Sequence, residues 1–127
     1  MAETGTVFLD IPQEQHLLQG EHFFVIKDSF PVSPGHCLIV SRDPKADYFD
    51  LNKTERHELT ELIHQVRACI EQEHSPDGYN IGMNIGECAG QTIMWPHIHF
   101  IPRRNGDADH KGGLRHAHPG ADHKQYY

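Results

Sequence analysis

The chain has 127 residues, 37% hydrophobic and 23% charged, which suits one soluble globular domain spanning residues 1–127. Its formal net charge of −7 argues against general binding to nucleic acid. No apolar run approaches the roughly 18 residues that a membrane span needs. The N-terminus is acidic, unlike a signal peptide, and three scattered cysteines form no disulfide framework, so we expect a cytoplasmic protein without a membrane partner.

The N-terminal half of the chain predicts a hairpin. Residues 22–27 and 37–40 are apolar, partly β-branched runs that predict two strands. Residues 28–35 lie between them and contain Asp, Ser, Gly and two prolines, a composition typical of turns. We therefore expect an antiparallel pair with a long, proline-stiffened connection. Residues 44–51 then have apolar side chains suited to a short helix.

A long amphipathic helix is expected next. Asn52 and Glu55 have the spacing of a capping box, which makes Asn52 the predicted N-cap. One buried stripe is indicated by apolar residues at helical spacing, namely Leu59, Leu62, Ile63, Val66, Cys69 and Ile70. The helix should end near His74, because residues 75–78 read Ser-Pro-Asp-Gly.

Two further strands complete the domain. Residues 80–85 and 92–101 predict strands, and residues 86–91 predict the loop between them. The order β-β-α-β-β indicates an α+β domain, with an antiparallel sheet and its long helix on one face. Pro96 cannot donate to a strand ladder, so the last strand is either an edge there or bulged. Residues 105–127 form a histidine-rich tail, for which a solvated segment and a weak metal site are the two interpretations.

The last predicted strand also places two histidines on one face. Side chains alternate along a strand, so His97 and His99 should point the same way, roughly 6–7 Å apart. A phosphate group fits between two such imidazoles. One imidazole can attack the phosphorus while the other gives a proton to the leaving group. The pair therefore suggests nucleophilic catalysis on a phosphate ester or anhydride, although a packed strand histidine is the alternative for each.

Residues 90–103 resemble the signature of the histidine-triad (HIT) family of nucleotide hydrolases and transferases. That signature reads Gly-Gln-x-φ-x-His-x-His-x-His-x-x-Pro-Arg, with φ apolar. The matching residues are Gln91, His97, His99, Pro102 and Arg103. Trp95 stands at the position of the first triad histidine. The resemblance extends over residues 21–104 and implies a HIT-like fold, with about five antiparallel strands, one long helix and one short helix.

The resemblance also implies three catalytic residues. His97 matches the nucleophile, and its second ring nitrogen should bond a main-chain carbonyl near the first triad position, a group that Trp95 retains. His99 matches the third triad histidine, which protonates the leaving group or supports the phosphate. His36 matches a histidine from the neighbouring strand that lies against the triad, or it merely follows the Pro34–Gly35 turn.

Seven positions match or neighbour substrate contacts. The resemblance places Asn84, Gln91 and Thr92 at the phosphate, Asp28 at the ribose, Ile26 and Leu38 at the base, and Trp95 on the active face. Neutral donors of this kind can hold non-bridging phosphate oxygens. Each position also has a structural interpretation: a self-satisfied loop for the polar residues, turn formation for Asp28, and core packing for the apolar pair. The indole of Trp95 is expected either to stack on the ligand or to fill part of the pocket.

These residues together imply a HIT-type hydrolase. It would release a nucleoside monophosphate, with AMP as the expected product, from a phosphoanhydride, phosphoramidate or dinucleoside polyphosphate through a nucleotidyl-histidine intermediate. The alternative is a HIT-like nucleotide-binding protein with weak or no catalysis. The N-terminal Cys-x-x-Cys that helps some family members bind zinc is missing, so neither metal nor cofactor is expected. The family resemblance also implies a homodimer.

Overall fold

A computed structural model describes residues 7–107 and 113–114 of the chain. Most of the predicted histidine-rich tail lies outside these residues, including His110, His116, His118 and His123. Within the described ranges, no helix is both long and apolar enough to cross a membrane.

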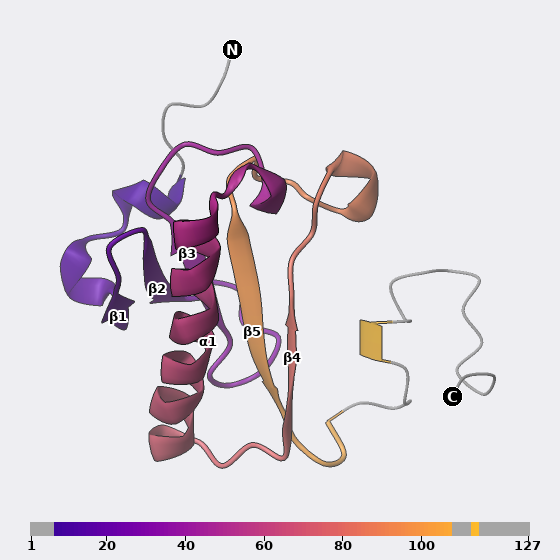
Figure 1. Ribbon diagram of the computed structural model, residues 1–127. Helices are drawn as coiled ribbons and strands as arrows, with labels where there is room; N and C mark the ends of the chain where they lie inside the picture. Colours follow the sequence, from indigo (N-terminus) through magenta and orange to yellow (C-terminus); the bar gives the residue numbers. More distant parts are fainter. Residues whose placement is uncertain (1–6, 108–112, 115–127) are drawn as a thin grey trace.

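The fold is a five-stranded antiparallel sheet with one long helix, which confirms the predicted α+β class (Figure 1). The strands are β1 (Leu18–Gln19), β2 (Phe23–Lys27), β3 (Cys37–Ser41), β4 (Gly78–Gly82) and β5 (His97–Arg103). Their order in the sheet is β1-β2-β3-β5-β4, and every neighbouring pair is antiparallel. The predicted hairpin is the β2–β3 pair, in which Val25 lies opposite Ile39.

Helix α1 (Lys53–Glu73) covers one face of this sheet (Figure 1). Its start confirms the predicted capping box, because the side chain of Asn52 accepts from the Glu55 amide while the side chain of Glu55 accepts from the Asn52 amide. These two bonds satisfy amide groups that the first helical turn leaves without partners. His74 follows as the C-cap.

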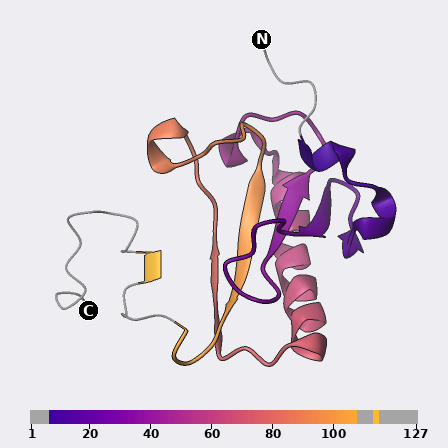
Figure 2. The same ribbon diagram turned by 180° about the vertical axis from the view of Figure 1, so that it is seen from behind.

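Strand alternation divides the buried apolar residues between the two faces of the sheet. The helix-side core contains Phe23, Val25, Cys37, Ile39, Ile98 and Phe100 from the strands and Leu59, Leu62, Val66 and Ile70 from α1. A second cluster contains Phe8, Phe24, Ile26, Leu38, Val40 and Trp95. Strand alternation places this cluster on the sheet face opposite α1, which lies behind the strands in Figure 2. The N-terminal segment, residues 7–17, contributes Phe8 and Ile11 to it and partly takes the place of a second helix layer.

Several element boundaries differ from the sequence predictions. The short helix predicted at 44–51 is a single 3-10 turn, η3 (Tyr48–Asp50). Pro96 precedes β5 instead of lying inside it, and its carbonyl accepts from the Ser41 amide, so no bulge is needed to accommodate it. The 3-10 turns η1 (Val7–Asp10), η2 (Gln13–Gln15) and η4 (Glu87–Ala89) and the short strand β1 were not predicted.

Candidate active site

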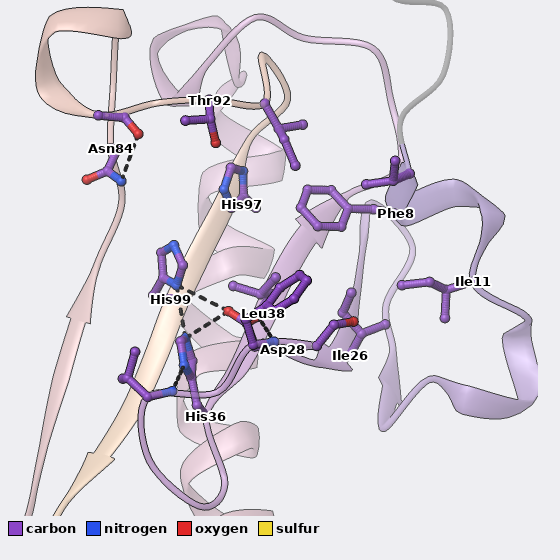
Figure 3. A pocket seen from close by; sticks show the side chains of 16 residues that line it. Phe8, Ile11, Ile26, Asp28, His36, Leu38, Asn84, Thr92, His97 and His99 are labelled. Atoms are coloured by element: carbon purple, nitrogen blue, oxygen red, sulfur yellow. Dashed lines mark hydrogen bonds and ion pairs between the residues drawn. The ribbon is translucent and has the colours of Figure 1, made fainter.

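A pocket of about 510 Å³ opens on the sheet face opposite α1 (Figure 3). β2, β3 and β5 form its floor, the N-terminal segment forms one wall, and the loop before β5 closes one end. Its polar lining residues are Asp28, Ser29, His36, Asn84, Thr92, His97 and His99. Its apolar lining residues are Val7, Phe8, Ile11, Ile26, Phe30, Val32, Leu38 and Ile93. The pocket therefore combines apolar walls with a few convergent polar groups, as small-molecule sites do.

His97 is the first residue of β5, and its tautomer follows from one contact. Its Nδ1 atom lies 2.7 Å from the main-chain oxygen of Trp95. A carbonyl oxygen can only accept, so Nδ1 carries the proton and Nε2 carries a free lone pair. The ring of Phe8 packs against this imidazole at a centroid distance of 5.1 Å. His97 thus offers the pocket a nucleophilic nitrogen on a ring held in place from two sides.

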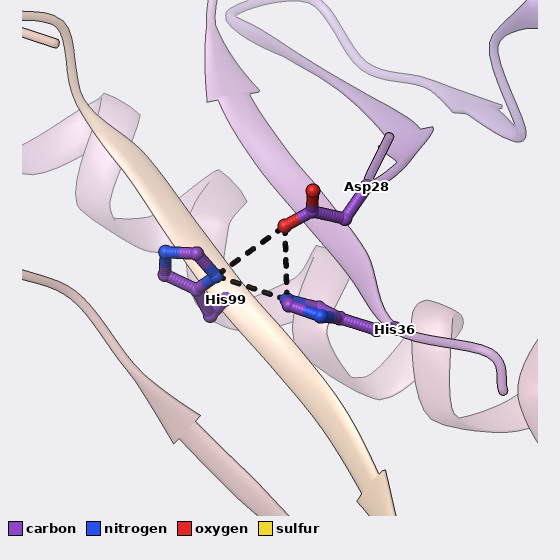
Figure 4. Close-up of side chains that lie close together, drawn as sticks. All are labelled: Asp28, His36 and His99. Atoms are coloured by element: carbon purple, nitrogen blue, oxygen red, sulfur yellow. Dashed lines mark hydrogen bonds and ion pairs between the residues drawn. The ribbon is translucent and has the colours of Figure 1, made fainter. Parts of the chain in front are cut away.

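His99 has the opposite tautomer, and His36 sets it (Figure 4). The amide of Val32 donates to Nδ1 of His36 at 3.1 Å, so the proton of a neutral His36 must be on Nε2. That Nε2 lies 3.0 Å from Nδ1 of His99 and 3.2 Å from Oδ2 of Asp28, and it can donate to either. A second hydrogen between these two ring nitrogens, 3.0 Å apart, would clash with the Nε2–H of His36, so Nδ1 of His99 is unprotonated and the proton of a neutral His99 is on its own Nε2.

Both of these histidines are held in the neutral form. Burial lowers the pKa of His36 below its ordinary value, against the opposing charge of Asp28. Burial also lowers the pKa of His99, and the neighbouring His97 and His36 lower it further, with Asp28 again opposing. The rings of His97 and His99 lie 5.5 Å apart. A neutral His97 therefore offers the pocket an Nε2 lone pair, and the neutral His99 offers it an Nε2–H.

The loop before β5 supplies neutral hydrogen-bonding groups beside these imidazoles. Gly86 and Gly90 have positive φ angles of 91° and 98°, which let the chain make the tight 3-10 turn η4 between them. The side chains of Asn84 and Thr92 both reach the pocket near His97 (Figure 3). The Asn84 amide also contacts the carbonyl of Gly90 at 3.5 Å. An amide and a hydroxyl are thus placed where a bound anion would meet His97.

Comparisons with known proteins agree with this architecture. The HIT domain family profile matches residues 11–106. The chain belongs to the HIT family. It is 31% identical over 114 residues to AP-4-A phosphorylase of Mycobacterium tuberculosis, covering 85% of this chain and 58% of that protein. It is 35% identical over 77 residues to the asymmetrical bis(5'-nucleosyl)-tetraphosphatase of Schizosaccharomyces pombe, covering 61% and 42%.

Solved HIT structures share the fold. A hypothetical histidine triad nucleotide-binding protein from Sulfolobus tokodaii superposes with a TM-score of 0.71 at 29% identity, covering 79% of this chain and 66% of that one. A HIT-like protein from Bartonella henselae superposes with a TM-score of 0.74 at 18% identity, covering 84% of each chain, a likeness of fold alone. This HIT chain spans little more than half the length of the mycobacterial relative.

Gln91 is not placed as the sequence suggested. Its side chain is 3% exposed and is absent from the pocket lining. The amide oxygen accepts from the Gly86 amide at 2.8 Å, and the amide nitrogen donates to the carbonyls of Ala46 and Ile93 at 3.2 and 3.1 Å. Gln91 therefore joins the loop to the segment after β3. This role matches the structural alternative given for it above, in which the polar side chains of the loop form hydrogen bonds within the protein.

Trp95 is also not a pocket-lining residue of this HIT chain. Its side chain is 1% exposed within the second apolar cluster, and its indole N–H donates to the carbonyl of Ser41 at 2.6 Å. An indole held in this way cannot stack on a ligand in the pocket without leaving the cluster. What Trp95 gives the site is its main-chain carbonyl, the acceptor of the His97 proton.

The apolar part of the site is larger than the sequence indicated. Ile26 and Leu38 line the pocket at the positions predicted for base contacts. Phe8 and Ile11 line it as well and were missed, because the short apolar run that contains them has neither strand nor helix periodicity. Their packing against β2 and β3 depends on long-range contacts that sequence patterns do not report.

Two groups of side chains come close enough to suggest a metal, but neither fits one well. Asp28, His36 and His99 bring donor atoms within 4.8 Å of one another. The Val32 amide, however, keeps the proton of His36 on the nitrogen that would have to bind the ion.

The second group is His22, Asp43 and Glu55. In this group the Glu55 carboxylate already accepts from the Asn52 amide and lies 3.6 Å from the Lys45 ammonium. Its charge is therefore already compensated, and the expectation of no metal stays a prediction.

Proposed function

We propose that this HIT protein is a nucleotide hydrolase that releases a nucleoside monophosphate, AMP in the first instance, from a phosphoanhydride, phosphoramidate or dinucleoside polyphosphate. The observation that carries the proposal is that Nδ1 of His97 and Nδ1 of His99 have different hydrogen-bond partners, from which opposite tautomers follow. His97 presents a lone pair and His99 presents an N–H to the same pocket. Phosphoryl transfer through a covalent intermediate needs such a nucleophile and such an acid.

The first chemical step uses both imidazoles. Nε2 of His97 attacks the α-phosphorus and forms a P–N bond, while the bond from phosphorus to the leaving group breaks. The departing atom keeps the electron pair and takes the proton from Nε2 of His99. The negative charge left on the His99 ring is balanced by the positive charge that attack creates on the His97 ring, whose centroid lies 5.5 Å away, until water returns the proton in the second step. Attack makes the His97 ring cationic, and the carbonyl of Trp95, which accepts its Nδ1–H, stabilises this charge.

The second step regenerates the protein. Water attacks the phosphorus of the nucleotidyl-His97 intermediate and gives a proton to Nε2 of His99. The P–N bond breaks and returns its electron pair to Nε2 of His97. Asn84 and Thr92 would hold the non-bridging oxygens during both steps, since an amide and a hydroxyl can stabilise phosphate charge without neutralising the nucleophile.

Binding of the nucleoside would use the remaining lining residues. Phe8, Ile11, Ile26 and Leu38 would enclose the base through apolar contact. Asp28 would accept from the ribose hydroxyls. Its Oδ1 already accepts from the Phe30 amide and its Oδ2 faces His36, but a carboxylate has about four acceptor positions and can add a diol.

We further propose that Trp95 stands at the first triad position, where a buried indole takes the place of the imidazole of the family's first histidine. The substitution would leave the main-chain carbonyl contact to His97 in place. It would remove one imidazole from the phosphate site, so slower turnover or a changed preference for leaving groups is the expected consequence. The AP-4-A phosphorylase and tetraphosphatase names of two relatives support a nucleotide substrate.

The direct test is release of AMP from a fluorogenic AMP phosphoramidate and from diadenosine polyphosphates. Turnover should fall more than about a thousand-fold in His97→Ala, because the nucleophile is lost. His64→Ala, at an exposed position on α1, is the matched control and should behave as wild type. Unchanged turnover in His97→Ala would contradict the mechanism. AMP binding without turnover in the wild type would instead identify a nucleotide-binding protein.

A further inference from the structure

Two large apolar side chains stand almost fully in solvent at the mouth of the pocket. Phe30 is 86% exposed and Val32 is 72% exposed, yet both line the pocket. By contrast, the apolar lining residues of the strands β2 and β3, Ile26 and Leu38, are buried. Single exposed apolar residues are common on proteins, but two at one pocket entrance form a surface that a ligand can cover.

The backbone around Phe30 and Val32 is held in place, so their side chains project from fixed positions. The amide of Phe30 donates to Oδ1 of Asp28 at 2.8 Å, and the amide of Val32 donates to Nδ1 of His36 at 3.1 Å. The Asp28 amide donates to the His36 carbonyl at 3.1 Å and closes the base of the connection. A surface that is already ordered loses less conformational entropy when a ligand binds.

The position of this surface relates it to the leaving group. Phe30 and Val32 belong to the β2–β3 connection, and His36, at its end, contacts His99. His99 is the residue proposed to protonate the leaving group. The walls proposed for the nucleoside base come instead from the N-terminal segment and from the strands (Figure 3).

The charge of the pocket favours the same interpretation. Among residues 7–107 and 113–114, no lysine or arginine lines it. A leaving group that is only phosphate would therefore meet no cationic side chain there, whereas a planar ring would find an aromatic face and a branched aliphatic one. Stacking on an aromatic side chain accepts many ring systems.

We propose that Phe30 and Val32 form a subsite for an aromatic ring carried by the leaving group, either the second base of a dinucleoside polyphosphate or an aryl group joined through an amine. This inference rests on the proposed function and narrows its substrate class. It predicts that conjugates with a ring beyond the scissile bond bind more tightly than matched conjugates without one.

Binding is measured first by calorimetry, which needs no turnover. The ligands are AMP, methylene-bridged ADP and methylene-bridged diadenosine triphosphate. The wild type should bind the diadenosine compound about tenfold more tightly than the ADP analogue, a preference of the size that stacking supplies. Phe30→Ala should lose this preference and keep its affinity for AMP, whereas Phe30→Tyr, which retains the ring, should keep both.

A kinetic experiment distinguishes the two kinds of leaving group that could carry the ring, an aryl amine and a second nucleotide base. The values of kcat/KM are compared for AMP phosphoramidates of tryptamine and of ethylamine. A Phe30-dependent preference for tryptamine assigns the subsite to aryl amines, and a preference confined to the diadenosine compound assigns it to a second base. Phe49→Ala is the control, since Phe49 is 75% exposed but lies outside the pocket lining.

Three results would overturn the proposal. Equal loss of affinity for all three calorimetry ligands in Phe30→Ala would place Phe30 in the nucleoside site. A ring preference unaffected by Phe30→Ala would place the subsite elsewhere, with the proposed function intact. A wild type that binds no AMP would remove the proposed function and this inference together.

Discussion

Two histidine side chains from one strand face the pocket, and each has a different partner for its Nδ1 atom. The Nδ1 of His97 meets a main-chain carbonyl, which can only accept, and the Nδ1 of His99 meets Nε2 of His36, which donates. The amide of Val32 determines the tautomer of His99 indirectly, because it donates to Nδ1 of His36 and so leaves the proton of a neutral His36 on Nε2. Chemically identical side chains thereby acquire the different protonation that a nucleophile and an acid need.

A pH dependence of stability follows from the lowered pKa values of His36 and His99. In the unfolded chain each has an ordinary pKa near 6.5, above its folded value. Between these values the unfolded chain binds protons that the folded chain does not. The stability that the two neutral histidines contribute is therefore complete above about pH 6.5. Below that pH the free energy of unfolding should decrease as the pH falls.

Urea unfolding between about pH 7.5 and pH 5 measures this slope. His99→Gln should flatten it, because one of the two responsible groups is removed, while His64→Gln, at an exposed helix position, should not. Stability that is constant or rises as the pH falls, or an equal slope in His99→Gln, would contradict the assignment of a neutral pair.

Trp95→Phe tests the structural role of the buried indole. The ring volume is mostly retained, but the carbonyl of Ser41 loses its 2.6 Å partner in a buried position. The free energy of unfolding should decrease by about 1–3 kcal/mol, measured by urea unfolding followed by circular dichroism. The affinity for AMP should stay within about twofold, since Trp95 is absent from the pocket lining. A large loss of AMP affinity with unchanged stability would make Trp95 a ligand contact.

Some of these residues could be placed from the sequence, and others could not, for physical reasons. His97 and His99 were found because strand alternation and motif spacing are local properties. Gln91 has the right residue type and spacing for a phosphate contact, but its amide is taken by the carbonyl of Ala46, 45 residues earlier. Such a long-range partner leaves no mark in a local pattern.

Among the structural elements, the loop before β5 matters most to the site. It leads from the end of β4 to His97 and carries Asn84 and Thr92 at the pocket. The Gln91 side chain makes three hydrogen bonds. Two of them, with Gly86 and Ile93, lie within the loop, and the third joins the loop to Ala46 in the segment after β3. Two glycines with positive φ allow its tight turn.

Gln91→Ala should therefore loosen this loop without unfolding the domain. Amide hydrogen exchange of residues 84–94 should increase, and AMP affinity should decrease about tenfold as Asn84 and Thr92 lose their fixed positions. Thr60→Ala on the exposed side of α1 is the control. Faster exchange with unchanged AMP affinity would mean that the loop does not hold the phosphate.

The elements themselves were predictable to different degrees. Helix α1 and its N-cap were predicted correctly, because apolar spacing and a capping box are strong local signals. The start of the last strand was predicted five residues too early, at residue 92 instead of His97. Ile93 and Trp95 pack in the second apolar cluster and do not pair in the sheet. The N-terminal turns carry no periodicity that would have indicated them.

At the scale of the whole molecule, β4 is an edge of the described sheet. Its Ile81 is 41% exposed, and an uncovered edge strand with an apolar residue is a surface on which another chain can pair. We expect the predicted homodimer to form there. Light scattering after size exclusion should give a dimer mass for the wild type and a monomer mass for Ile81→Lys.

Leu17→Lys is the control for this prediction. Leu17 has a similar exposure of 39%, but it lies beside β1 at the opposite edge of the sheet. A wild type that is monomeric at all concentrations would contradict the homodimer, and a dimer that survives Ile81→Lys but not Leu17→Lys would move the interface to the other edge.

The central claim is that Nε2 of His97 forms a covalent bond to the nucleotide, and intact-mass spectrometry of acid-quenched single turnovers tests it most directly. A fluorogenic AMP phosphoramidate is mixed with excess protein and quenched during the reaction. We predict a transient gain in mass equal to one adenylyl group, located on His97 by peptide mapping and missing in His97→Ala. AMP release at the same rate with no covalent species, or with the adenylyl group on another residue, would contradict it.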